Sequence, residues 1–161
     1  MKSFKQIALS AMLTLGAFGA VTYTSCNKDE CKDVVCENGG TCSGGNCNCP
    51  VGYEGDRCEI VSSLKMLGDY NGNETCDVGS DDYNVEITAH SNVLSINIKN
   101  IYNQSFTAVG TVTGTNTFTF QGSSGSTSYT GSGEVDGNTL TLEYDITSPL
   151  ASNSCTFIGT K

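Results

Sequence analysis

The distribution of nine cysteines constrains this chain more than any other feature of its sequence. Cys26 follows an apolar N-terminal stretch, and Cys76 and Cys155 lie near the two ends of the C-terminal part. The other six fall in one short block, at Cys31, Cys36, Cys42, Cys47, Cys49 and Cys58. Cysteines at this density predict disulfide bonds and therefore an oxidising compartment. We expect a leader, a disulfide-rich segment and a larger C-terminal domain.

Residues 1–25 have the pattern of an export signal peptide. Lys2 and Lys5 precede an apolar run over 7–21, which is shorter than the roughly 20 residues that a membrane-spanning helix needs. Such a leader takes no part in the fold of the mature protein.

The end of the leader, Tyr23-Thr24-Ser25-Cys26, resembles the lipobox of bacterial lipoproteins. The resemblance implies cleavage before Cys26 and acyl chains on it, which would also account for the odd cysteine. Two or more acyl chains anchor a protein stably to a membrane. The alternative is cleavage near Ala20, with Cys26 free or paired.

The next residues, Asn27-Lys28-Asp29-Glu30, are similar to the signal that follows the acylated cysteine in some Gram-negative surface lipoproteins. This similarity implies a location in the bacterial outer membrane with display on the cell surface. The alternative is a solvated charged tether.

The chain beyond residue 25 is strongly acidic, with 6 basic against 17 acidic residues and a formal net charge of −11. Nucleic acids and anionic lipid headgroups are bound by basic patches. The composition therefore argues against both as partners, while it permits divalent cations, neutral glycans and proteins.

The cysteine block resembles an epidermal-growth-factor-like (EGF-like) module over residues 31–59. The match includes Asn38-Gly39-Gly40-Thr41-Cys42 and the ending Cys47-Asn48-Cys49-Pro50-Val51-Gly52-Tyr53. The resemblance implies the bridges Cys31–Cys42, Cys36–Cys47 and Cys49–Cys58. A segment this short needs such bridges, because it cannot bury enough apolar surface to fold without them. In this family the module is either a protein-binding surface or a spacer, and we favour the spacer.

Three residues before this block are candidate calcium ligands. Asn27, Asp29 and Glu30 are similar to the calcium-binding N-terminal segment of some EGF-like modules, and calcium prefers such oxygen ligands. The alternative is that the same residues form the tether after the anchor. Zinc is the competing interpretation of clustered cysteines, but no histidine lies nearby.

Alternating apolar and polar residues predict antiparallel strands throughout residues 64–161, after a linker at 60–63. The expected strands lie at 64–70, 85–89, 94–98, 105–113, 118–120, 127–135, 140–146 and 153–160. About eight short strands in succession suggest a meander that closes into a small barrel or folds as a sandwich. The fold class is therefore mainly β.

Three further features concern this β domain. Cys76 and Cys155 are expected to pair, because each lacks another partner. Gly131 and Gly133 occupy inward positions beside Tyr129, where a strand bends or an aromatic ring packs over the backbone. The segment Leu67-Gly68-Asp69-Tyr70 resembles the Gly-x-Trp motif of lipocalin-like barrels, with tyrosine in place of tryptophan.

Residues typical of catalysis are sparse, so we expect no enzyme. The only histidine, His90, lies in an expected turn, and no serine has the glycine pattern of a nucleophile elbow. Asp77, Asp81 and Asp82 are expected to form a solvated acidic loop, with calcium binding as the alternative. No cofactor other than calcium is expected.

These observations favour a non-enzymatic surface lipoprotein in which an EGF-like spacer presents a β-barrel to an extracellular protein, glycan or small ligand. One alternative is an accessory structural subunit of an outer-membrane assembly that docks through the EGF-like module. The other is a lipocalin-like carrier, which needs an apolar cavity inside the barrel.

Overall fold

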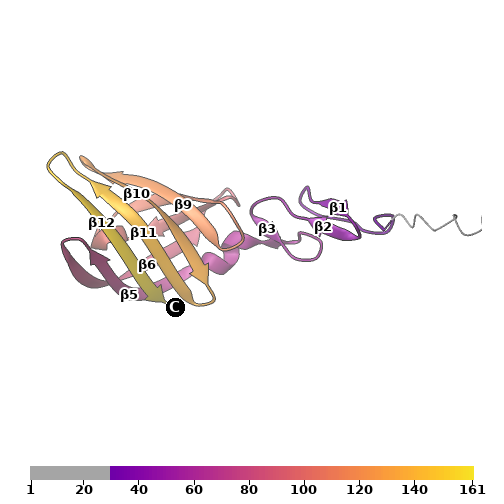
Figure 1. Cartoon of the computed structure of the whole chain (residues 1–161), viewed down its shortest axis with the longest axis horizontal. Coiled ribbons are helices and arrows are strands. Elements are labelled where there is room, and N and C mark those ends of the chain that lie inside the picture. The colour runs from indigo at the N-terminus through magenta and orange to yellow at the C-terminus, as the bar shows by residue number, and fades with distance from the viewer. Residues whose placement is uncertain (1–29) are drawn as a thin grey trace, which may run out of the picture.

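The two groups of cysteines mark two structural units in the computed structural model, which describes residues 30–161. A small disulfide-rich segment, here called the cysteine module (residues 31–59), leads into a closed β-barrel (Figure 1). The expected signal peptide (1–25), the lipid anchor Cys26 and the candidate calcium ligands Asn27 and Asp29 lie outside the described residues.

The cysteine module contains one short hairpin and the first strand of a second, whose other strand lies in the connection to the barrel. Strand β1 (Thr41–Ser43) pairs with β2 (Asn46–Asn48), and β3 (Tyr53–Glu54) pairs with β4 (Ile60–Val61). The bridges are Cys31–Cys42, Cys36–Cys47 and Cys49–Cys58, the same pairs that the sequence resemblance implies. Among residues 31–59 only Gly52 and Cys58 are buried, so the bridges replace a hydrophobic core.

The barrel is an eight-stranded antiparallel meander, which confirms the expected fold class and selects the barrel over the sandwich. Its strands are β5 (Gly68–Cys76), β6 (Gly79–Ala89), β7 (Ser95–Lys99), β8 (Thr107–Val112), β9 (Thr117–Ser124), β10 (Thr127–Asp136), β11 (Thr139–Thr147) and β12 (Ser152–Thr160). Each strand pairs with the next along the chain, and β12 pairs with β5 to close the sheet.

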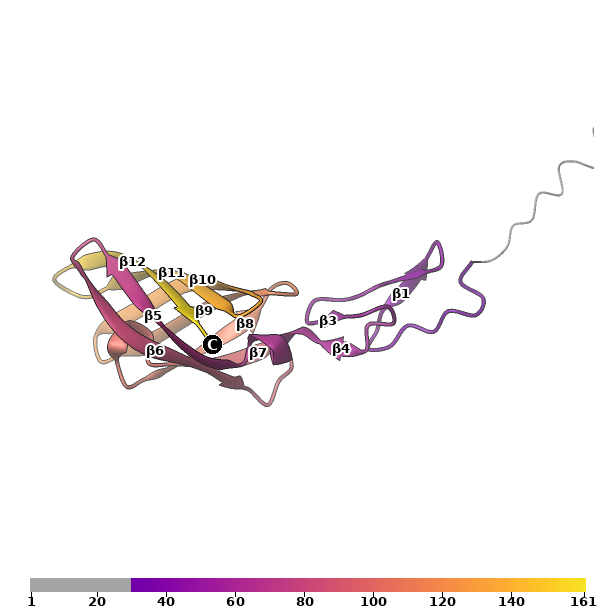
Figure 2. The same ribbon diagram turned by 90° about the horizontal axis from the view of Figure 1, so that it is seen from below.

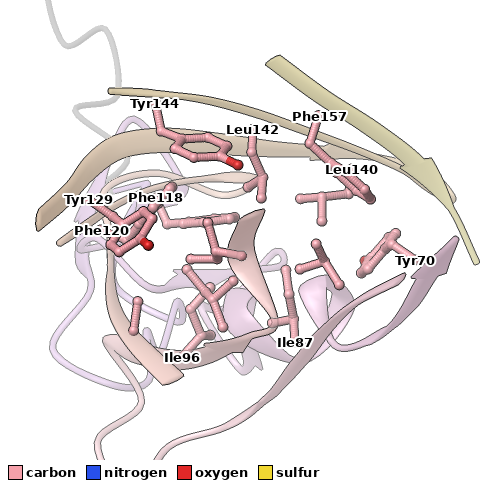
Figure 3. Close-up of a cluster of buried hydrophobic side chains, with 14 of the residues drawn as sticks. Tyr70, Ile87, Ile96, Phe118, Phe120, Tyr129, Leu140, Leu142, Tyr144 and Phe157 are labelled. Carbon is pink, nitrogen blue, oxygen red and sulfur yellow. The ribbon is translucent and has the colours of Figure 1, made fainter. Parts of the chain in front are cut away.

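The alternation of inward and outward residues builds one core inside the barrel. Aromatic and branched side chains from opposite walls point toward one another there (Figure 3). Tyr70, Phe118, Leu140, Leu142 and Phe157 are fully buried. In barrels of eight strands the interior is just wide enough for side chains to fill it. This core is therefore what holds the eight strands together.

The seam between β5 and β12 closes the barrel and combines small residues with a disulfide. Gly72 lies opposite Gly159, and a Cβ atom on Gly72 would lie 2.1 Å from the carbonyl oxygen of Ile158. Cys76 and Cys155 lie directly opposite each other and are bonded, as the sequence predicts. The first and last strands therefore approach closely, and a covalent bond fixes their register.

The structure differs from the sequence prediction at the start of the barrel. Residues 64–70 are not one strand, because Ser62–Met66 form a 3₁₀ helix, η1, and β5 begins at Gly68. The expected linker at 60–63 is likewise taken up by β4 and the start of η1. Met66 is buried, and Tyr70 Oη donates a hydrogen bond of 2.8 Å to its carbonyl oxygen. Burial of Met66 therefore turns the chain under one end of the barrel.

The cysteine module contacts this same end of the barrel (Figures 1 and 2). The Ser62 amide donates to the Gly52 carbonyl oxygen at 2.9 Å, and Lys65 Nζ lies 2.8 Å from Glu54 Oε2. Leu94, in the β6–β7 connection, packs so closely on Gly52 that a Cβ atom there would lie 2.3 Å from Leu94 Cδ2. The two units therefore meet through packing as well as through the chain.

Helical structure within residues 30–161 is limited to η1 and a second short turn, η2 (Ile101–Asn103). Neither has the length and apolar character that a membrane-crossing helix requires.

Candidate functional site

The end of the barrel away from the cysteine module is its distal mouth. Because β5 starts beside the module and the strands alternate in direction, the connections that follow β5, β7, β9 and β11 all lie at this end (Figure 1). These connections are residues 77–78, 100–106, 125–126 and 148–151.

A buried carboxylate, Glu74, lies just below the distal mouth. Its inward position on β5 follows from the alternation that also turns Tyr70 and Cys76 inward, and the residue is only 3% exposed. Tyr83 Oη donates a hydrogen bond of 2.6 Å to Glu74 Oε1, and Tyr144 Oη donates to the same oxygen. The cluster Glu74–Tyr83–Tyr144 thus joins β5, β6 and β11 across the interior.

The environment of the cluster suppresses ionisation of its phenols. Burial raises the pKa values of Tyr83 and Tyr144 well above the ordinary tyrosine value, and their hydrogen bonds to Glu74 raise them further. Both phenols are therefore neutral donors at physiological pH. Their hydrogen bonds satisfy a carboxylate that would otherwise be costly to bury.

We expect Tyr144→Phe to change the stability of the barrel in two ways. At neutral pH it removes a donor to buried Glu74, so the free energy of unfolding should fall by about 1–3 kcal/mol. A phenol with a raised pKa in the folded state stabilises that state fully below about pH 10 and loses this contribution as pH rises toward the folded pKa, at about 1.4 kcal/mol per pH unit.

The alkaline fall in stability should therefore be shallower in Tyr144→Phe than in the parent protein. Urea denaturation at several pH values between neutral and strongly alkaline gives the free energy of unfolding of each protein as a function of pH, and the two slopes can then be compared. Equal slopes would show that Tyr144 ionises as readily in the folded chain as in the unfolded chain.

The connection over 100–106 covers one side of the cluster in a strained conformation. Asn100, Tyr102 and Asn103 have left-handed φ values of 66°, 57° and 50°, each costing on the order of 1–3 kcal/mol for a residue other than glycine. Specific contacts hold this shape: the Tyr102 amide donates to Tyr83 Oη at 3.0 Å, and Asn103 Nδ2 donates to Asp81 Oδ2 at 3.0 Å. The connection is thus fixed to the cluster.

A pocket of about 300 Å³ opens at the distal mouth, with Glu74 among its lining residues. Val78 and Tyr102 supply apolar surface, while Asp81, Asn103 and Gln104 supply polar groups. A buried carboxyl group in such a pocket, beside phenols with raised pKa values, is the arrangement from which we infer a binding site.

A larger concavity of about 750 Å³ lies on the outer wall of the barrel. Its side-chain lining includes Thr130, Ser132, Glu143 and Asp145, all of which are exposed. It is an open surface lined by exposed side chains, so we place the candidate site at the distal mouth instead.

The arrangement at the mouth does not make a metal centre. Glu74 Oε, Cys76 Sγ and Cys155 Sγ lie within 4.8 Å of one another, but both sulfur atoms belong to one disulfide. Metal-binding sulfur is thiolate, so a single carboxylate remains.

The acidic residues that the sequence assigns to a loop are placed differently by the structure. Asp81 and Asp82 belong to β6, and only Asp77 lies in a connection, because β5 and β6 form a hairpin with a two-residue turn. Their carboxylates accept hydrogen bonds from separate partners, namely Ser154 N for Asp77, Asn103 Nδ2 for Asp81 and Asn73 Nδ2 for Asp82. The three therefore do not converge on one ion.

The remaining candidate residues lie away from the distal mouth. Glu30, the described member of the candidate calcium set, is exposed beside Gly44 and Gly45 in the cysteine module. His90 lies in the β6–β7 connection at the module end of the barrel, where its Nδ1 accepts a hydrogen bond from the Asn92 amide at 3.2 Å. His90 is thus remote from Glu74.

Searches of protein-family models, of curated proteins and of solved structures find no match to this chain.

Proposed function

We propose that this protein is a non-enzymatic lipoprotein of the bacterial outer membrane, anchored through Cys26 and displayed on the cell surface. In this proposal the cysteine module is an EGF-like spacer, and the lipocalin-like barrel binds an extracellular protein at its distal mouth. The end-to-end arrangement carries the proposal, since the N-terminal end of the cysteine module and the distal mouth lie at opposite ends of the described structure (Figures 1 and 2).

The junction between the two units favours a spacer over a flexible tether. Leu94 packs on Gly52, and Lys65 pairs with Glu54 within a few residues of the point where the chain passes from one unit to the other. A spacer fixed in this way would hold the distal mouth away from the membrane.

The many buried rings and branched side chains of the interior favour binding at the mouth over the carrier alternative. A carrier of an apolar ligand needs a cavity lined by its core residues. Here the inward positions hold closely packed rings, such as Phe118 and Phe120 with centroids 6.4 Å apart and Phe120 and Tyr144 at 6.0 Å.

Proteolysis of intact cells tests the display directly. A protease site inserted into the 148–151 connection should be tolerated, because loop tips accept insertions, and Leu150 there is 98% exposed. Protease added to intact cells should cleave the protein, and Cys26→Ala should release the protein from the membrane fraction. Cleavage only after cell lysis would contradict surface display, and retention of the Cys26→Ala protein would contradict the lipid anchor.

Deletion of the cysteine module separates the leading function from the accessory-subunit alternative. If the module is a spacer, the protein lacking residues 31–59 should still bind its extracellular partner when purified. If the module is the docking surface, the same deletion should abolish capture of a stoichiometric partner by cross-linking in the envelope.

A further inference from the structure

The carboxyl group of Glu74 has no cationic partner among residues 30–161. The ion pairs there are Arg57–Glu37, Lys65–Glu54 and Lys99–Glu86, all of them elsewhere. Tyr83 and Tyr144 give Glu74 hydrogen bonds but no positive charge. Buried charges in proteins are normally paired or bound to a metal, so this carboxylate offers an unused counter-charge.

The pocket above Glu74 has the lining that suits a long cationic side chain. Val78 and Tyr102 provide apolar contact along it, and Glu74 supplies a negative group in its lining. Asp81, Asn103 and Gln104 add oxygen acceptors. Lysine and arginine combine an apolar stem with a charged head, so they suit a lining that offers both apolar and acidic groups.

The electrostatic field at the distal mouth favours the same ligand. The connections at 77–78, 100–106, 125–126 and 148–151 contain no lysine, arginine or histidine. Lys99 ends β7 just before the 100–106 connection, but its charge is paired with Glu86 at 2.8 Å. Lys65 and Lys161 lie at the module end, where Lys161 Nζ donates to the Lys65 carbonyl oxygen at 2.7 Å. The acidic groups near the mouth, Asp77 and Asp81, form no ion pair within the described part of the chain, so they attract cationic partners and speed their association.

The donor set argues for an organic cation over a metal ion. Calcium takes about 6–8 oxygen ligands, whereas Glu74 is the only buried carboxylate among residues 30–161 and its Oε1 already accepts two phenol hydrogen bonds. We infer that the distal mouth receives a lysine or arginine side chain of a protein partner, with Glu74 as its counter-charge. This inference rests on the proposed function and specifies the chemistry of its partner.

Titration of the full-length protein with small probes tests the pocket without knowledge of the partner. Butylammonium and butylguanidinium represent the two side chains, and butylurea is the neutral analogue of the second. In NMR spectra both cations should shift, saturably, the amide resonances of residues 74–81 and 102–104, while butylurea should not. Binding should also weaken as ionic strength rises, because the interaction is between charges.

Two variants decide whether Glu74 carries the interaction. Glu74→Gln keeps a hydrogen-bond acceptor for the tyrosines and should weaken cation binding about tenfold or more. Asp82→Asn removes the same charge from an exposed carboxylate on β6 and should change binding by less than about twofold. A dispersed NMR spectrum and an unchanged melting temperature establish that each variant is folded, and the ionic-strength dependence of the parent protein supplies a readout that needs no variant.

Four results would overturn the inference: no saturable shift with either cation, equal binding of butylurea, unchanged binding by Glu74→Gln, or equal loss in Asp82→Asn. Calcium producing the same shifts and displacing butylammonium would replace the organic cation with a metal ion. None of these results bears on anchoring or display, which proteolysis of intact cells measures separately.

Discussion

Removal of the Cys76–Cys155 bridge is expected to lower the free energy of unfolding of the barrel by about 4–5 kcal/mol. The bridge spans a sequence separation of 79 residues, and closing a loop of that length restricts the unfolded chain by about this amount in the chain-entropy treatment. For a domain of this size the melting temperature should fall by on the order of 20 °C. Urea and thermal denaturation of the Cys76→Ala/Cys155→Ala protein, followed by circular dichroism, measure the loss.

A matched pair in the cysteine module provides the control. Cys31 and Cys42 are also bridged, but their separation is only 11 residues and neither belongs to the barrel. The Cys31→Ala/Cys42→Ala protein should therefore leave the barrel transition unchanged. If the two double variants lower the free energy of unfolding of the barrel equally, the module and the barrel unfold together. The seam bridge then contributes no more to stability than a bridge in the module.

Phe118→Ala should destabilise the barrel by about 3–5 kcal/mol, because it leaves a cavity in a close-packed core. Phe118 is 0% exposed, and its ring packs beside that of Phe120. Chemical denaturation should show a lower midpoint, while the dependence of the unfolding free energy on denaturant concentration stays the same. Ser132→Ala, on the exposed face of neighbouring β10, should change stability by less than about 0.5 kcal/mol.

Gly133 provides an internal check on this interpretation. A Cβ atom there would lie 2.2 Å from Phe118 Cζ, so Gly133→Ala alone should cost about 1–3 kcal/mol through overpacking. Combined with Phe118→Leu, the added methyl group gains room, and the double variant should be more stable than the two single effects predict. If the stability effects of the two substitutions simply add, the Phe118 ring and a side chain at position 133 do not compete for the same space.

The sequence predicts most of the barrel because apolar alternation is clear along its later strands. The segments 127–135, 140–146 and 153–160 lie within β10, β11 and β12. The inward placement of Gly131 and Gly133 is also confirmed, since a Cβ on Gly133 would meet the Phe118 ring. One face of each of these strands is buried, so the alternation of apolar residues in the sequence directly indicates which residues point into the barrel.

The β5–β6 hairpin could not be located in the same way. Its residues 71–75 and 79–84 are rich in asparagine, aspartate and glycine, which are depleted in strands. They form strands because both edges of β5 are paired, on one side with β6 and on the other with β12. Tertiary pairing here overrides local preference, which is why Asp81 and Asp82 resemble a loop in the sequence.

The candidate site was missed for a related reason. Glu74 lies two residues before Cys76, and the inward alternation from Tyr70 passes through it, so a signal was present. Recognising that signal requires knowledge that β5 continues to Cys76. The contacts of Glu74 with Tyr83 and Tyr144 depend on the register of β5 with β6 and, through β12, with β11, which local sequence does not specify.

The closing seam has a consequence for the order of the strands along the chain. Because β12 pairs with β5 and Lys161 lies beside Lys65, the strand order is cyclic. A circular permutant of the barrel that joins residue 161 to residue 64 through a short linker and opens the chain at Gly125 would keep every strand pair of the barrel. The connectivity of the native chain is therefore one of several that the same sheet accommodates.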